Sequence, residues 1–131
     1  MVTVYCIEGT DIYRDALHRI ISSVNGLLSL GETANGRTGL EEITALRPDV
    51  VILDSDMVDT NGFDVVRSLR NASMPCTIIM ISDHTNPCIR QTAISAGVDF
   101  FLDKFFESQK IGPILETLVR LLSNSEEEVT H

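Results

Sequence analysis

The chain has 131 residues, enough for one domain of ordinary size with its own hydrophobic core. Apolar residues make up 44% of it, which excludes an intrinsically disordered chain. Its 10 basic and 19 acidic residues give a net charge of −9, so we expect neither nucleic acid nor an anionic membrane as a direct partner.

The first half of the chain predicts two strand–helix units. The first helix follows a cap at Thr10 or Asp11, whose side chains can accept hydrogen bonds from free backbone amides. The second strand is the weakest in the chain because it has no β-branched residue. The expected elements are a strand over residues 2–7, a helix over 12–24, a strand over 27–32 and a helix over 40–46.

The second half predicts three more units. Its first two strands are almost continuous apolar runs, which is typical of strands buried on both faces of a parallel sheet. An Asn61-Gly62 turn precedes the third helix, and Pro87 and Gly97 mark the two ends of the fourth. The expected elements are strands over residues 50–53, 77–81 and 98–102, and helices over 63–69, 87–97 and 111–122.

The alternation of strands and helices predicts an α/β fold built from five strand–helix units, (βα)5. Right-handed crossovers between parallel strands place helices on both faces, which gives a doubly wound sheet in three layers. Ligand sites in such sheets lie beyond the carboxyl ends of the strands. Residues at those ends are therefore the first candidates for function.

Acids, a hydroxyl and an amine follow four of the five predicted strands. Because the carboxyl ends of parallel strands meet at one edge of a sheet, we expect these groups to converge. Each alone is ordinarily a turn, cap or surface residue, and it is the combination that favours a function. The residues are Glu8 after the first strand, Asp54, Ser55 and Asp56 after the third, Ser82 and Asp83 after the fourth, and Asp103 and Lys104 after the fifth.

These groups suit phosphoryl transfer with Mg²⁺. Carboxylate and carbonyl oxygens are the ligands that hard cations prefer. A carboxylate nucleophile 4 Å from an anionic phosphoryl group is repelled by roughly 1 kcal/mol in water and about 4 kcal/mol at an effective dielectric of 20. A divalent metal reverses that sign, a lysine neutralises another oxygen, and a hydroxyl can bind the third.

At these positions the sequence resembles the receiver domain of bacterial two-component response regulators, over residues 2–122. The resemblance implies a flavodoxin-like sheet with strand order 2-1-3-4-5. The matching segments are residues 47–54 (RPDVVILD), Met57, residues 61–63 (NGF), residues 81–82 (IS) and residues 96–104 (AGVDFFLDK).

The resemblance also implies roles for the residues at the strand ends. Asp54 would accept a phosphoryl group, in phosphorelay signalling, from a sensor histidine kinase, a phosphotransfer protein or a small phosphodonor. Ser82 would bind a phosphoryl oxygen, and Lys104 would pair with the aspartyl phosphate. Glu8, Asp54 and the backbone carbonyl of Asp56 would hold Mg²⁺.

The resemblance implies a switched surface as well. Phe101 would be the aromatic switch residue that turns inward on activation, and the surface of the last two helices and the last strand would then bind a downstream protein or output domain. The final helix carries a wide apolar stripe that includes Ile114, Val119 and Leu121, which predicts a weak homodimer or else a broad core face.

Two departures from the family pattern affect the metal site. The family has two adjacent acids after the first strand, and this chain has Glu8 and Gly9, so we expect weaker Mg²⁺ binding. Asp83 stands where the family prefers a small residue. It either repels the incoming phosphoryl group, or replaces the missing metal ligand, or is a solvated loop residue. Asp11 is a second candidate for the missing ligand.

Other functions remain open at this point. The same departures motivate a degenerate receiver that acts as a phosphorylation-independent protein-interaction module. Residues 52–56 (ILDSD) are also similar to the Asp-x-Asp motif of haloacid-dehalogenase-type phosphatases, but that reading leaves residues 2–46 without a role. A flavin module would need a phosphate-binding loop where residues 8–11 (EGTD) are acidic. We expect a signalling switch rather than an enzyme.

The remaining features concern the environment of the chain. It has no apolar run long enough to span a membrane and no signal-peptide pattern, so we expect a cytoplasmic protein. Cys6, Cys76 and Cys88 have no metal-type spacing, and the first two read as small core residues in a reducing compartment. Residues 123–131 predict a polar, acidic tail after a domain over 1–122.

Overall fold

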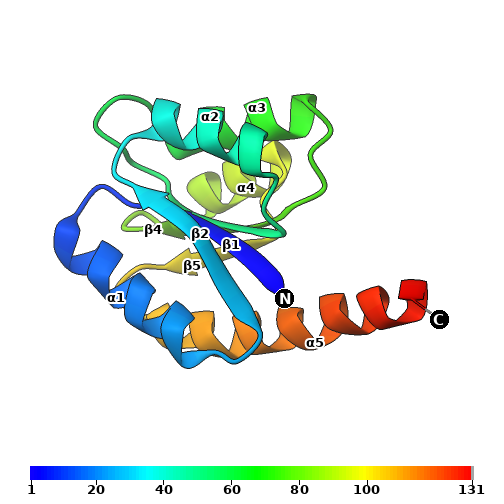
Figure 1. Ribbon diagram of the computed structural model, residues 1–131. Coiled ribbons are helices and arrows are strands. Elements are labelled where there is room, and N and C mark those ends of the chain that lie inside the picture. The colour runs from blue at the N-terminus through cyan, green and yellow to red at the C-terminus, as the bar shows by residue number, and fades with distance from the viewer. Residues whose placement is uncertain (131) are drawn as a thin grey trace.

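The computed structural model describes the backbone of residues 1–130 and the side chains of residues 1–123 (Figure 1). Five strands alternate with five helices along the chain, as the sequence predicted. In chain order they are β1 (Val2–Ile7), α1 (Asp11–Ser23), β2 (Leu27–Thr33), α2 (Gly36–Leu46), β3 (Val50–Asp54), α3 (Gly62–Asn71), β4 (Thr77–Ser82), α4 (Pro87–Ala96), β5 (Phe100–Asp103), a 3₁₀ turn (Ser108–Lys110) and α5 (Ile111–Thr130).

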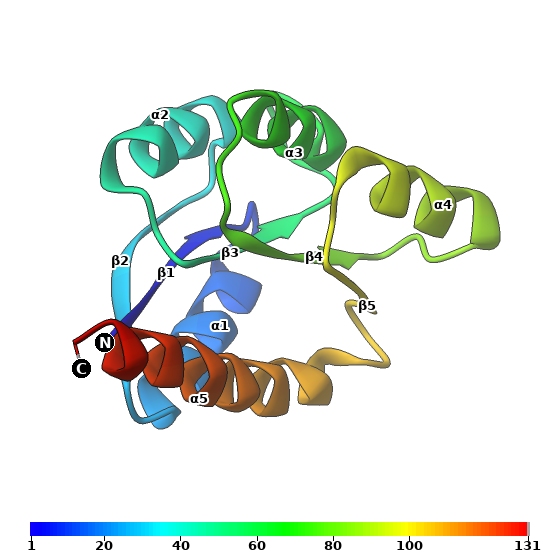
Figure 2. The ribbon, with the colours of Figure 1, turned by 90° about the vertical axis from the view of Figure 1, so that its right-hand side faces the viewer.

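The five strands form one parallel sheet in the order β2-β1-β3-β4-β5, which confirms the expected topology. Helices α1 and α5 cover one face of the sheet, and α2, α3 and α4 cover the other (Figure 2). The sheet is therefore the middle of three layers. Its central strands β1, β3 and β4 are almost entirely buried, because helices lie on both sides of them.

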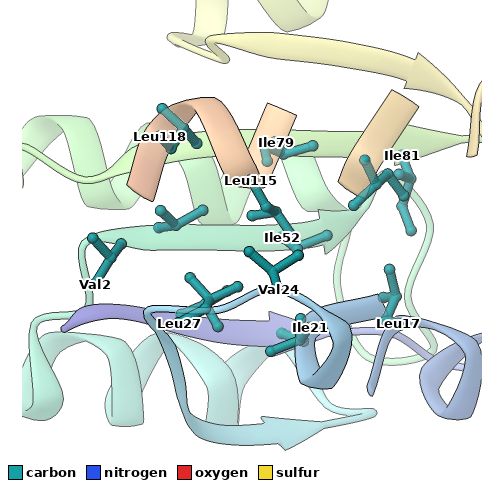
Figure 3. Packing of buried hydrophobic residues seen from close by; sticks show 14 of the residues in the cluster. Val2, Leu17, Ile21, Val24, Leu27, Ile52, Ile79, Ile81, Leu115 and Leu118 are labelled. Carbon is teal, nitrogen blue, oxygen red and sulfur yellow. The ribbon is translucent and has the colours of Figure 1, made fainter. Parts of the chain in front are cut away.

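The core has two halves, one on each face of the sheet. Successive strand residues point to opposite faces, so Ile52 packs with the side chains of α1 and α5 while Leu53 packs with those of α2, α3 and α4. Full burial of one such side chain contributes about 1.5–3 kcal/mol. Figure 3 shows part of the first half, with Leu17 and Ile21 of α1 and Leu115 and Leu118 of α5 around Ile52, Ile79 and Ile81.

Asparagine side chains begin three of the helices. Asn35, Asn61 and Asn86 each accept a hydrogen bond from a backbone amide three residues later, which satisfies one free donor of α2, α3 and α4 respectively. Thr10 occupies the cap position of α1, but its side chain makes no cap hydrogen bond. Its hydroxyl is used instead at the functional site described below.

Arg70, at the end of α3, joins this helix to the segment before β4 and to the segment after α4. Its guanidinium donates to the carbonyl oxygens of Gly97, Met74 and Cys76 and pairs with the carboxylate of Asp99 at 2.9 Å. These contacts hold the end of α4 and the start of β4 against α3. Three of the acceptors are backbone carbonyl oxygens of residues that lie outside the helices and strands, so Arg70 supplies these main-chain groups with a donor.

The structure differs from the sequence prediction in several places, and the helix expected over residues 40–46 begins at Gly36. β2 contains an irregularity where Val4 pairs with Ser29 and Tyr5 with Gly31, which leaves Leu30 as an extra residue. β5 begins at Phe100 rather than at residue 98, because Gly97 adopts a left-handed conformation and residues 98–99 complete the turn. The backbone of α5 continues to Thr130, beyond the expected end at residue 122.

The helical backbone of α5 thus extends over most of the segment expected to be a tail. The side chains of residues 124–130, and His131 altogether, lie outside the described residues. The division into a domain over 1–122 and a tail over 123–131 stays a prediction.

Candidate functional site

The carboxyl ends of β1, β3, β4 and β5 bring the predicted residues together at one edge of the sheet. Glu8, Asp54, Ser82 and Lys104 all lie there and are all buried, with at most 7% of each residue exposed. Polar side chains are buried in proteins when they have partners or a function. The convergence expected from the sequence is therefore present.

Lys104 lies between the two carboxylates. Its Nζ atom donates to Oε1 of Glu8 at 2.8 Å and to Oδ2 of Asp54 at 2.7 Å. The other oxygen of Asp54, Oδ1, accepts from the backbone amide of Asp56 at 3.0 Å. One ammonium thus serves two buried carboxylates, and the group of three side chains has one more negative than positive charge when all are ionised.

Glu8 is held by its own loop as well as by Lys104. Its Oε1 accepts from both the backbone amide and the hydroxyl of Thr10, each at 3.1 Å. This contact explains why Thr10 does not cap α1 with its side chain. Arg14 donates to the backbone carbonyl of Glu8 at 2.8 Å, which ties the first turn of α1 to the end of β1.

Burial and pairing shift the titration of this group. Burial raises the pKa of Glu8 above its ordinary value, and the charge on Asp54 adds to the rise, while the Lys104 ammonium opposes it. Burial by itself lowers the pKa of Lys104, but the hydrogen bonds to Asp54 and Glu8 outweigh it, so the pKa of Lys104 is raised. Lys104 is therefore held in its charged form at neutral pH.

The ring of Tyr13 covers Lys104 from the side of α1. Nζ of Lys104 lies 4.5 Å from the ring centroid, a distance at which the ring face attracts a cation. The Tyr13 hydroxyl pairs with the Ser108 hydroxyl at 2.5 Å, and that hydroxyl bonds the backbone carbonyl of Lys104. The sequence analysis missed both residues, because Tyr13 reads as one more apolar position of an amphipathic helix.

Ser82 is bound to a neighbour that the sequence analysis gave no role. The hydroxyl of Ser55 donates to Oγ of Ser82 at 2.7 Å, and both residues are buried. Ser82 also accepts from the amide of His84 at 3.0 Å and donates to its carbonyl at 2.9 Å. The adjacency of Ser55 to Asp54 was the one available signal.

Phe101, the predicted switch residue, has a buried side chain in the core half formed with α2, α3 and α4. The guanidinium of Arg90 lies 5.1 Å from the centroid of its ring. Arg90 also donates to the backbone carbonyl of Phe101. The inward position of the ring is thus fixed from the side of α4.

Asp11, Asp56 and Asp83 are exposed and lie outside the buried group. Asp56 faces His84, with its carboxylate 3.7 Å from the imidazole nitrogen. Asp11 pairs with Arg14 on the surface of α1. Asp83 lines a pocket of about 300 Å³ beside Lys104, together with residues of α1 and the β5–α5 loop. Its role as a metal ligand or a repelling charge stays a prediction.

The donor set fits a hard cation with few protein ligands. Within residues 1–123, no group of three or more Asp, Glu, His or Cys side chains is placed to hold a metal. Two carboxylates do converge, and Oε2 of Glu8 is buried without a hydrogen-bond partner in that part of the chain. An orphaned carboxylate oxygen is a position that a cation would satisfy. Gly9 adds no ligand, and a Cβ atom there would meet open space.

Among the described residues, no helix is both long enough and apolar enough to cross a lipid bilayer.

Comparison with known sequences gives one matching family. The family model described as the response regulator receiver domain matches residues 4–116. The protein-glutamate methylesterase/protein-glutamine glutaminase 3 of Pseudomonas syringae is 30% identical over 131 residues, which cover 95% of this chain and 34% of the relative. The nitrate/nitrite response regulator protein NarL of Escherichia coli is 29% identical over 111 residues, covering 83% and 50%. The chain thus spans about a third to a half of these relatives.

Comparison with solved structures gives the same result. The signal receiver domain of NarL from Mycobacterium tuberculosis has a TM-score of 0.83 and 28% identity, and the match covers 91% of this chain and 96% of that one. A chemotaxis protein of Vibrio cholerae has a TM-score of 0.77 and 26% identity, with coverage of 92% and 98%.

Proposed function

Because this chain belongs to the response regulator receiver domain family of two-component signalling, we propose that it accepts a phosphoryl group on Asp54. The observation that carries the proposal is the buried contact of Asp54 with Lys104 at the carboxyl edge of the sheet. Receiver domains act with histidine kinases, so the donor is a histidine kinase, a phosphotransfer protein or a small phosphodonor. We infer that the aspartyl phosphate serves as a signal and that the chain does not turn over a substrate as an enzyme would.

In this proposal each residue has a task in the transfer. An Asp54 oxygen forms the bond to phosphorus while the bond from phosphorus to the donor breaks. Lys104 neutralises charge on the acceptor and the product, and its position is fixed by Glu8 and by the ring of Tyr13. Glu8, Asp54 and the backbone carbonyl of Asp56 would hold Mg²⁺, which would supply charge neutralisation at the phosphoryl oxygens.

The signal passes through the residues on the α4 side of the site. The added charge on Asp54 attracts the hydroxyl of Ser82, which lies at the end of β4. Phe101 and Arg90 connect the neighbouring strand β5 to α4. A change at Ser82 therefore reaches a surface to which a downstream protein or output domain can bind.

A second candidate is a receiver that works as a phosphorylation-independent interaction module. It is favoured by Gly9, which supplies no second acid, and by Lys104, which already pairs with both carboxylates. The phosphatase alternative has no comparable support, because Asp54 lies on the third strand of the chain and the family match begins at residue 4.

Phosphodonor labelling tests the proposal. Purified protein is incubated with acetyl phosphate or phosphoramidate and Mg²⁺, and intact mass is measured over time. We expect one phosphoryl group per chain, none after Asp54→Asn, and retained labelling after Asp56→Asn, whose exposed carboxylate is the matched control. Absence of labelling with both donors would favour the interaction module, and repeated turnover of donor would favour a phosphatase.

A further inference from the structure

We propose that Ser55 is a positioning residue that holds the hydroxyl of Ser82 away from Asp54 until phosphorylation releases it. The inference rests on the proposed function, since it concerns the response of Ser82 to an aspartyl phosphate. It adds a residue that neither the sequence analysis nor the family resemblance assigned. The observation behind it is the 2.7 Å hydrogen bond between the two buried serine hydroxyls.

The hydrogen bonds of Ser82 are complete in this conformation. A hydroxyl has one proton to donate and two acceptor positions. Ser82 donates to the carbonyl of His84 and accepts from the amide of His84 and from the hydroxyl of Ser55. A phosphoryl oxygen on Asp54 can gain the Ser82 proton only if the contact with the His84 carbonyl is broken.

We call the hydrogen bond between Ser55 and Ser82 the latch. The alternation of side chains along the strands places it on the opposite side of the sheet from the carboxylate of Asp54. Ile52 packs with α1 and α5 and Leu53 with the α2–α4 layer, so Asp54 follows toward α1 and Ser55 toward α3 and α4. On β4, Ile81 packs with α1 and α5, so Ser82 also follows toward α3 and α4. The bond between the two serines agrees with this placement, as does the bond between Asp54 and Lys104.

The backbone gives Ser55 a fixed position from which to act. Its amide donates to the carbonyl of Ile81 at 3.0 Å, which continues the pairing of β3 with β4 past Asp54. Its carbonyl accepts from the amide of Gly62 at 2.8 Å. Because both the amide and the carbonyl of Ser55 are hydrogen-bonded, its backbone is fixed, and its hydroxyl holds Ser82 in a fixed place. The Ser55 bond thus competes with the aspartyl phosphate for the position of Ser82.

Ser55→Ala removes the latch without adding volume. The unswitched arrangement loses one hydrogen bond, and the switched arrangement no longer leaves the Ser55 hydroxyl buried without a partner. We therefore expect the beryllofluoride concentration that half-saturates the protein, in the presence of Mg²⁺, to fall by about two- to tenfold, the range that one neutral hydrogen bond supplies. Ser55→Cys keeps a weaker donor and should give an intermediate value.

A double-variant comparison separates positioning from a merely structural role. In the Ser82→Ala background the latch has no target, so Ser55→Ala should leave beryllofluoride affinity unchanged there. Ser29→Ala, at an exposed position on β2, is the control for a serine change elsewhere in the sheet. An unchanged or higher half-saturating concentration in Ser55→Ala, or an equal effect with and without Ser82, would overturn the proposal.

A measurement on the unphosphorylated protein keeps the two proposals distinguishable. The amide of His84 donates to Oγ of Ser82, so loosening Ser82 should speed its hydrogen exchange by at least about twofold in Ser55→Ala, by the same hydrogen-bond range. If wild type binds neither phosphoryl group nor beryllofluoride, the proposed function fails, and the His84 amide alone decides whether Ser55 holds Ser82. Unchanged exchange of that amide rejects the latch.

Discussion

The ammonium of Lys104 lies 2.8 Å from the carboxylate of Glu8, although the two residues stand 96 positions apart in the chain. The contact joins the residue after β5 to the residue after β1, and the same ammonium also bonds Asp54. Glu8 also makes bonds to Thr10, so the same carboxylate fixes both a loop and a cation. The proposed metal site and the proposed phosphoryl site therefore share one side chain.

A second acid after β1 should strengthen metal binding. Gly9→Asp places a carboxylate where a Cβ meets nothing within 4 Å, so the change needs no rearrangement. An added charge about 4 Å from a cation contributes at least about 1 kcal/mol, which predicts at least about a fivefold gain in Mg²⁺ affinity. Titration calorimetry measures the gain, and Gly9→Asn is the neutral control. No gain would mean that another group, such as Asp83, already fills the position.

Removal of Lys104 should destabilise the fold in a pH-dependent way. Lys104→Met leaves two buried carboxylates uncompensated, which we expect to lower the free energy of unfolding by about 3 kcal/mol at neutral pH. The pKa of Glu8 is already raised, and loss of the ammonium raises it further. When the folded state raises the pKa of a carboxyl group, the free energy of unfolding falls as the pH rises from the ordinary pKa of that group through its raised pKa.

The deficit of Lys104→Met should therefore shrink as pH falls from 8 toward 5. Urea unfolding at several pH values measures it, with Glu8→Gln/Lys104→Met as the paired variant in which one buried charge has been removed. A deficit that is the same at every pH would show that lost packing, rather than the uncompensated carboxylates, causes the destabilisation.

The three cysteines should differ in reactivity. Burial raises the pKa of Cys6 to about 12, and it also raises the pKa of Cys76, so both thiols stay protonated and covered. Cys88 is exposed at the start of α4. A thiol reagent at pH 8 should modify one cysteine in the native protein and three after unfolding. Cys88→Ser should abolish the native reaction.

Arg70 should matter far more than its neighbour on the same helix. Arg70→Ala leaves carbonyl groups of Gly97, Met74 and Cys76 without their donor, and we expect a loss of about 2–3 kcal/mol in the free energy of unfolding. Arg67→Ala is the matched control, because Arg67 is exposed and pairs only one turn away with Asp64 in a surface ion pair worth about 0.5 kcal/mol. Equal losses in urea unfolding would contradict the role given to Arg70.

The outer face of α5 predicts weak self-association. An apolar hollow of about 270 Å³ lies between β5 and α5, and it is lined by Phe100, Pro113, Ile114, Thr117, Leu118 and Leu121. Ile114→Glu should reduce any concentration-dependent increase in sedimentation coefficient, with and without beryllofluoride. A strictly monomeric wild type under both conditions would remove the homodimer prediction.

The sequence predicted the elements and the convergence of Glu8, Asp54, Ser82 and Lys104, because both follow from periodicity and from the geometry of parallel sheets. It did not predict the hydrogen-bond partners of each group. Thr10 was one of two residues expected to cap the first helix, and its hydroxyl instead bonds Glu8. Such choices depend on distances between segments that are far apart in the chain, and no local pattern encodes them.

The same limit applies to Tyr13 and Ser55. A tyrosine at an apolar position of a helix and a serine after a strand are common in any sequence, so neither residue could be assigned a role from the sequence. Their functions arise from what lies opposite them, Lys104 in one case and Ser82 in the other. The expected start of β5 at residue 98 was wrong for a related reason, because the apolar run there includes the turn that follows Gly97.

Asp54 and Ser55 are neighbours in the chain that serve opposite faces of the sheet. A deletion or insertion of one residue near the end of β3 would turn each side chain to the other face, so that the acid would no longer face Lys104 and the hydroxyl would no longer face Ser82. Substitutions at either position remove one group and leave the other in place. The length of this segment is therefore under a tighter constraint than its composition, and variation among related chains should concentrate in residue type rather than in residue number.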